Sequence, residues 1–162
     1  MDDRWREVEE IGSQMGFISE YNHTIDPKGR LIIPTKFRCE LGSSFIVTRG
    51  IDKCLYLYPM KTWEKFQENL ATLPINNEAA RTFVTFMSGG ASQVDMDSQG
   101  RILIPGYLRE YSDLIKDVVL IGSGARIELW SKERRDQKVK NIDINAISEA
   151  LGSQGFNIGL GM

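Results

Sequence analysis

The chain has 162 residues, of which 41% are apolar and 26% charged, and its formal net charge at pH 7 is −2. This composition is typical of a globular protein with one domain or two small ones and enough chain to bury a core. No apolar run approaches the roughly 20 residues that cross a bilayer, and the first residues lack the apolar stretch of a signal peptide. We therefore expect a cytoplasmic protein.

Residue types that bind metals or catalyse reactions are scarce. Two cysteines, Cys39 and Cys54, and one histidine, His23, exclude a zinc ribbon and disfavour a disulfide scaffold. We expect both cysteines to be small, partly buried side chains and His23 to lie at the surface or an interface. The sequence offers no acid–base pair, phosphate loop or cluster of carboxylates, so we expect no enzyme, no cofactor and no metal.

The charge is unevenly distributed along the chain. Residues 1–14 carry five acidic residues against two basic ones, whereas residues 26–49 carry five basic residues against two acidic ones. A basic stretch on a nearly neutral protein can bind polyanions, but a stretch of this size is more often a solvated surface. Charge alone therefore does not decide the function.

The chain contains an internal repeat. Residues 26–38 read DPKGRLIIPTKFR, and residues 97–109, which begin 71 positions later, read DSQGRILIPGYLR. The correspondence continues more loosely beyond both segments. We therefore expect two copies of one small unit to make up most of the chain.

Each copy predicts the same order of elements. Asp at the first position and Gly at the fourth favour a type I turn, which leads into a short buried strand rich in β-branched residues. Pro34 and Pro105 end these strands and begin short helices. The helices are expected at Thr35–Leu41 and about Gly106–Ser112, and the later strands at about 44–49, 54–58, 117–122 and 126–130. A unit of about 45 residues is marginal alone, so each copy needs the other copy or another subunit.

Two amphipathic helices are predicted between the copies. Thr62 is expected to cap the first, whose apolar stripe ends at Pro74, and the second is expected from about Asn77 to Ser88. We expect both stripes to pack in the core or between subunits. The segments are then an extension at 1–14, a first repeat at 17–63, a helical connector at 64–90, a second repeat at 91–134, and a C-terminal helix with a flexible tail at 135–162.

The two Asp-x-x-x-Arg motifs carry a family resemblance. Asp26 to Arg30 and Asp97 to Arg101 each lie inside an Asp-x-x-Gly-Arg-φ-φ-Ile-Pro block. With their flanks, these blocks resemble the MraZ family of bacterial transcriptional regulators. The resemblance covers about residues 15–140, and two motifs in register make it specific.

The resemblance implies a fold and a function. The fold class would be α+β, mainly β, with two tandem AbrB-like swapped-hairpin βα repeats in a pseudo-symmetric domain with connecting helices. Such proteins form closed homo-oligomeric rings on the nucleoid. They bind short G-rich direct repeats in double-stranded promoter DNA upstream of the division and cell-wall gene cluster, without a cofactor, a small-molecule substrate or a membrane.

Arginine suits this role chemically. Its planar guanidinium contacts phosphate or forks onto guanine O6 and N7, and an aspartate four residues earlier can hold it in one rotamer. The candidate DNA-contacting residues are Arg30, Arg101, Lys28, Lys36, Arg38 and Arg109, and the residues that support the motif are Asp26, Gly29, Asp97 and Gly100.

These assignments have structural alternatives. Arg30 and Arg101 can instead act only as turn clamps, and the other basic residues can belong to a solvated face. Copy two has Ser98 and Gln99 in place of a proline and a lysine, so we expect copy one to present the stronger DNA face. The alternative function is an antitoxin-type or protein-interaction module of the same fold. The duplication disfavours it, because antitoxins of this fold usually carry one copy.

Overall fold

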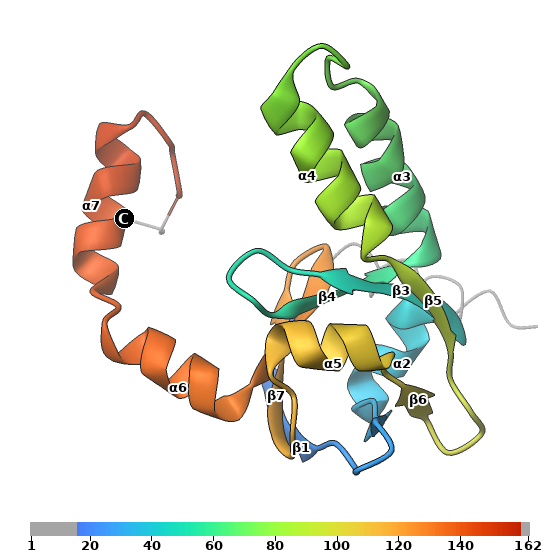
Figure 1. Ribbon diagram of the computed structural model, residues 1–162. Coiled ribbons are helices and arrows are strands. Elements are labelled where there is room, and N and C mark those ends of the chain that lie inside the picture. Colours follow the sequence, from blue (N-terminus) through green and yellow to red (C-terminus); the bar gives the residue numbers. More distant parts are fainter. Residues whose placement is uncertain (1–15, 160–162) are drawn as a thin grey trace, which may run out of the picture. The chain divides into compact units, whose positions relative to one another are not determined.

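The computed structural model describes residues 16–159 of the chain (Figure 1). The extension expected at 1–14 and the end of the tail at 160–162 lie outside the described residues. The chain divides into two compact units, one up to Lys132 and one from Glu133 onward. Among the described residues, no helix is both long enough and apolar enough to span a bilayer.

A six-stranded antiparallel sheet forms the centre of the first unit. Its strand order is β1-β7-β8-β4-β3-β5. The four strands expected after the short helices are confirmed to within one or two residues. The strands are β1 (Glu20–Thr24), β3 (Ser44–Arg49), β4 (Leu55–Pro59), β5 (Ser92–Asp95), β7 (Asp117–Ser123) and β8 (Arg126–Ser131).

The two sequence copies are interleaved in this sheet. The first strand of each copy pairs with the third strand of the other, β1 with β7 and β5 with β3, and the last strands, β4 and β8, pair at the centre. A separate two-stranded ribbon joins β2 (Arg30–Ile32) to β6 (Arg101–Leu103), again one strand from each copy. The expected fold, two tandem swapped repeats in one pseudo-symmetric domain, is confirmed.

Two short helices follow the ribbon strands. Both begin and end where the sequence predicts, α2 at Thr35–Leu41 and α5 at Gly106–Ser112, and each follows a proline. Their apolar sides, with Phe37 and Leu108, are buried in one core with the ribbon and one face of the sheet. Neither copy has this core by itself, because the ribbon and the sheet each contain strands of both.

A helical hairpin lies over the sheet and contributes a second core. It consists of α3 (Met60–Ala71) and α4 (Glu78–Gly89), and Trp63, Leu70 and Met87 are buried. The sequence predicts Thr62 as the cap of α3, but the helix begins three residues earlier than that cap implies, at Met60 after Pro59. Proline at this position fixes the backbone just before the first turn. The helix expected from about Asn77 to Ser88 is confirmed as α4, and Asn77 caps it: its side chain accepts a hydrogen bond of 3.0 Å from the backbone N–H of Ala80.

The second unit contains one helix and all but the first residue of another. The predicted C-terminal helix is confirmed as α7 (Ile144–Ser153), and Asp143 caps it through the backbone N–H groups of Asn145 and Ala146. The sequence does not predict α6 (Lys132–Lys140). That segment has a single apolar residue, Val139, so it lacks the apolar stripe that predicts the other helices.

Candidate nucleic-acid interface

The turn of copy one holds an arginine in a fixed position. The backbone N–H of Gly29 donates to the carbonyl of Asp26 at 2.9 Å, which closes the turn. The Asp26 carboxylate accepts from the backbone N–H groups of Lys28 and Arg30 at 3.0 and 2.8 Å. Its second oxygen accepts from Nε of Arg30 at 2.8 Å. One carboxylate therefore fixes both the turn and the side chain that follows it.

The turn of copy two has the same geometry. The Asp97 carboxylate accepts from the backbone N–H groups of Gln99 and Arg101 and from Nε of Arg101, each at 2.9 Å. The two side chains remain partly open to solvent, with Arg101 36% exposed and Asp97 42%. Within residues 16–159, the terminal nitrogens of neither motif arginine have a hydrogen-bond partner. These nitrogens are therefore available to an external acceptor.

Both motif carboxylates are stabilised in their charged form. The backbone N–H of Arg30 lowers the pKa of Asp26 below its ordinary value, aided by the Arg30 guanidinium. The backbone N–H of Arg101 does the same for the pKa of Asp97. Each carboxylate is thus ionised at neutral pH, which is the state that holds the guanidinium.

The ribbon places both arginines on one exposed face. Leu31 and Ile102 pair across it and point inward, with at most 1% of either exposed. Because side chains alternate along a strand, Arg30 and Arg101 share the outer face with Ile32, at diagonally opposite ends. From ordinary strand spacing, their Cα atoms lie about 8 Å apart. Both turns lie at the edge of the first unit away from the α3–α4 hairpin (Figure 1).

Arg38 and Arg109 reach the turns of the opposite copies. Nε of Arg38, on α2 of copy one, donates to the carbonyl of Ile33 at 2.9 Å, and its guanidinium lies against Gly100 of copy two. Nε of Arg109 likewise donates to the carbonyl of Ile104 at 3.1 Å, and its guanidinium lies against Gly29 of copy one. All four residues are candidates from the sequence, but the sequence does not predict these contacts between the copies.

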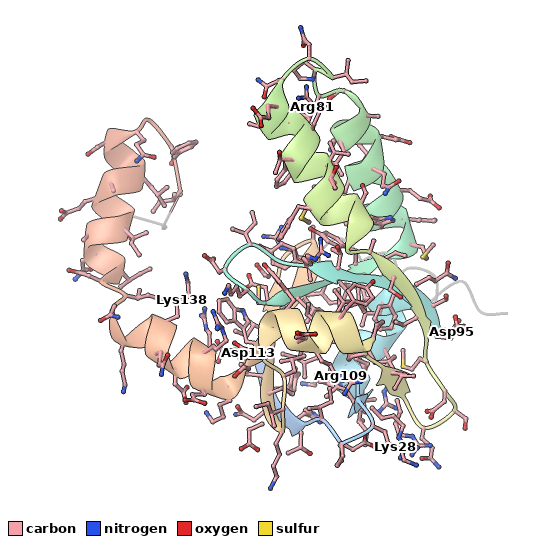
Figure 2. All side chains as sticks on the ribbon, viewed as in Figure 1. Lys28, Arg81, Asp95, Arg109, Asp113 and Lys138 are labelled. Carbon is pink, nitrogen blue, oxygen red and sulfur yellow. The ribbon has the colours of Figure 1, made fainter. Side chains whose placement is uncertain are left out.

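The two candidate lysines lie in different places. Lys28 is exposed at the tip of the first turn (Figure 2). Lys36, on α2, lines a groove with Phe17, Tyr21 and Glu40. On a helix, residues two apart point to nearly opposite sides, so Lys36 faces away from Arg38 and the second turn. Lys28 therefore lies on the surface formed by the two turns and the exposed face of the ribbon, which we call the turn face. Lys36 does not lie on this surface.

Metal-ligating side chains and the buried thiol do not form a site among the described residues. No group of three or more His, Cys, Asp or Glu side chains in residues 16–159 is arranged to hold a metal ion. Cys54 is buried, and its burial raises the pKa of the thiol to about 12. Such a thiol stays protonated at neutral pH and is a poor nucleophile.

The fold and the paired turns define a class of protein: one chain with two interleaved copies of a βα unit, which presents two Asp-held arginines on a shared ribbon. The family described as "MraZ protein, putative antitoxin-like" matches this chain twice, over residues 17–86 and 87–151. The chain belongs to the MraZ family.

Individual relatives agree with the family match. The chain is 49% identical to a protein of Clostridium tetani over 141 residues, which are 86% of this chain and 99% of the relative. It is 48% identical to one of Clostridium acetobutylicum over the same length, and 55% identical to one of Halothermothrix orenii over 118 residues, which are 73% of this chain and 82% of the relative. Each relative is named "Transcriptional regulator MraZ".

Proposed function

We propose that this protein is a transcriptional regulator that binds double-stranded promoter DNA in a sequence-specific manner through its two Asp-x-x-x-Arg turns. The observation that supports this most directly is the pair of Asp-held guanidiniums on one face of the ribbon. The names of the relatives support the regulatory role. The protein acts without an enzymatic activity or a cofactor, in the cytoplasm at the nucleoid.

The chemistry of the turns suits guanine-rich DNA. In each turn the carboxylate occupies Nε, while the arginine side chain stays partly exposed, 43% for Arg30 and 36% for Arg101. Two parallel N–H donors match the O6 and N7 acceptors of guanine in the major groove. Because the aspartate already fixes the side chain, binding loses little rotamer entropy. The resemblance to the family adds the particular target that we propose, a set of short G-rich direct repeats upstream of the division and cell-wall gene cluster.

The affinity of one chain for DNA is expected to be modest. Affinity for DNA rises with the number of phosphates neutralised, and the turn face of one chain carries few basic residues. A closed ring of identical chains would bind several repeats at once, and the linked contacts would raise the overall affinity. We propose such a homo-oligomer, and light scattering on the free protein should show a single large species.

The test is fluorescence anisotropy with two duplexes, one carrying several G-rich repeats from the upstream region of the gene and one scrambled. The variant is Arg30→Ala/Arg101→Ala. The matched control is Arg81→Ala, which removes the same kind of charge from α4. Arg81 lies on the hairpin, far from Lys28 (Figure 2), and donates to the carbonyl of Ile75 at 2.9 Å.

We expect tight binding that depends on the repeats, and a loss of about 5- to 150-fold for each arginine that makes a bidentate base contact. The Arg81→Ala control should bind like the wild type. Equal, salt-sensitive binding to both duplexes would leave only non-specific attraction. A folded oligomer that binds neither duplex would refute the proposal and favour the protein-interaction alternative.

A further inference from the structure

Arg38 and Arg109, on the short helices after the ribbon strands, make contacts inside the protein. A residue that only contacts DNA would not need these contacts. The Ile33 carbonyl accepts from Arg38, and the Ile33 N–H donates to the carbonyl of Gly100 at 2.8 Å. In the other half, the Ile104 N–H donates to the carbonyl of Gly29 at 2.8 Å. A chain of contacts therefore joins each guanidinium to the turn of the other copy.

The glycines of both turns leave the space that these guanidiniums fill. Gly100 is buried with φ +81°, and a Cβ added there would lie 2.5 Å from Nε and Nη2 of Arg38. Gly29 has φ +90°, and a Cβ there would lie 2.7 Å from Nε of Arg109. The backbone and the guanidinium are thus in direct contact, with no room for a side chain between them.

We propose that Arg38 and Arg109 are positioning residues, each of which holds the DNA-contacting turn of the opposite copy. This inference rests on the proposed function of the turns. The Arg38 guanidinium supports the loop of Asp97 to Arg101, and the Arg109 guanidinium supports the loop of Asp26 to Arg30. Each turn is therefore supported by an arginine from the copy that does not contain that turn.

A positioning role and a direct phosphate contact predict different behaviour of lysine. Lysine keeps the positive charge and can still bind phosphate as a point charge. A lysine side chain lacks the planar guanidinium, which contacts the turn glycine while its Nε donates to the carbonyl of Ile33 or Ile104. Lysine should therefore replace arginine in a phosphate contact but not in this support.

The first experiment needs no DNA. Hydrogen exchange is followed by mass spectrometry with fragmentation, which resolves the turn amides of 26–30 and 97–101 from the paired ribbon strands, in Arg38→Lys and in Arg109→Lys. Arg38→Lys should speed exchange about two- to tenfold in 97–101, the change expected for loss of about one net hydrogen bond, and leave 26–30 unchanged. Arg109→Lys should do the reverse. A change in both turns, in neither, or in the turn of the same copy would overturn the proposal.

The glycines provide a second test in case a lysine variant fails to fold. Gly100→Ala and Arg38→Ala are combined in a double-mutant cycle on the urea midpoint. Part of the cost of Gly100→Ala comes from the guanidinium, so its midpoint shift should be smaller when Arg38 is already alanine. Arg38→Ala and Gly29→Ala should add, because they belong to different clusters. Additivity in the first pair would refute the contact.

The DNA assay separates this inference from the proposed function. On the G-rich duplex, Arg38→Lys should weaken binding several-fold while the slope of log affinity against log salt stays that of the wild type. Wild-type affinity in Arg38→Lys, together with a slope lowered by about one in Arg38→Met, would instead indicate a phosphate contact. If wild-type protein does not bind DNA yet the crossed exchange pattern is found, the proposed function fails and the positioning role remains.

Discussion

Replacing Leu31 by alanine should test how the ribbon is built. Leu31 has no exposed surface and pairs across the ribbon with Ile102 of the other copy. A buried Leu→Ala change costs about 2–5 kcal/mol, because it removes apolar contacts and leaves a cavity. A loss of about 3 kcal/mol corresponds to a fall in Tm of about 6–12 °C for a protein of this size.

The matched control is the neighbouring residue on the other face. Ile32 is 45% exposed, so Ile32→Ala should change stability by no more than about 0.5 kcal/mol. Differential scanning fluorimetry of both variants, without DNA, gives the comparison. Equal falls in Tm, or a larger fall for Ile32→Ala, would refute the assignment of inner and outer faces and with it the exposed position of the two arginines.

Three further predictions concern a buried hydroxyl, the two cysteines and the charge of the motif carboxylates. Thr48→Val should lower the free energy of unfolding by about 1–3 kcal/mol in urea titrations, because the fully buried hydroxyl donates at 2.7 Å to a carbonyl of α4 that would lose its donor. A thiol reagent should label exposed Cys39 in the native protein and buried Cys54 only after denaturation. The Asp26→Asn/Asp97→Asn variant should unfold at lower urea than wild type at pH 7. Because the folded pKa values lie below the ordinary 3.8, this difference should persist down to about pH 4 and vanish as the pH falls through the lowered values.

Each of these three predictions has a result that would contradict it. A Thr48→Ser variant keeps the hydroxyl, so it should keep more of the stability than Thr48→Val, and an equal loss would argue against the hydrogen bond. Rapid native labelling of Cys54 would contradict its burial. A wild-type advantage that disappears already between pH 7 and 5 could not come from carboxylates with lowered pKa values.

Local patterns in the sequence predicted most of the elements. The Asp and Gly of each turn, the β-branched run and the proline after it determine turn, strand and helix within a few neighbouring residues. The predictions failed where the local signal was weak or absent. Pro59 ends an apolar strand and α3 begins directly after it, and α6 has a single apolar residue, Val139.

The partners of the site residues could not be predicted in the same way. The sequence shows that Gly29 and Arg38 recur as Gly100 and Arg109, which indicates that both residue types have a role in each copy. It does not say that Arg38 contacts Gly100 rather than Gly29, because that depends on which copy supplies each ribbon strand. Local periodicity contains no information on which strand of the other copy a given strand pairs with. The crossed contacts emerge only from the pairing of β2 with β6.

Duplication within one chain allows the two turns to differ while their scaffold stays the same. Lys28 and Gln99 occupy equivalent positions, since each backbone N–H donates to the motif carboxylate, at 3.0 and 2.9 Å. Lysine adds a charge that neutralises a phosphate, and glutamine does not. Lys28→Ala should therefore weaken binding to the G-rich duplex several-fold and lower the salt slope by about one per chain, while Gln99→Ala leaves the slope unchanged. Equal slopes in the two variants would show that the turns contribute alike and that copy one is not the stronger DNA face.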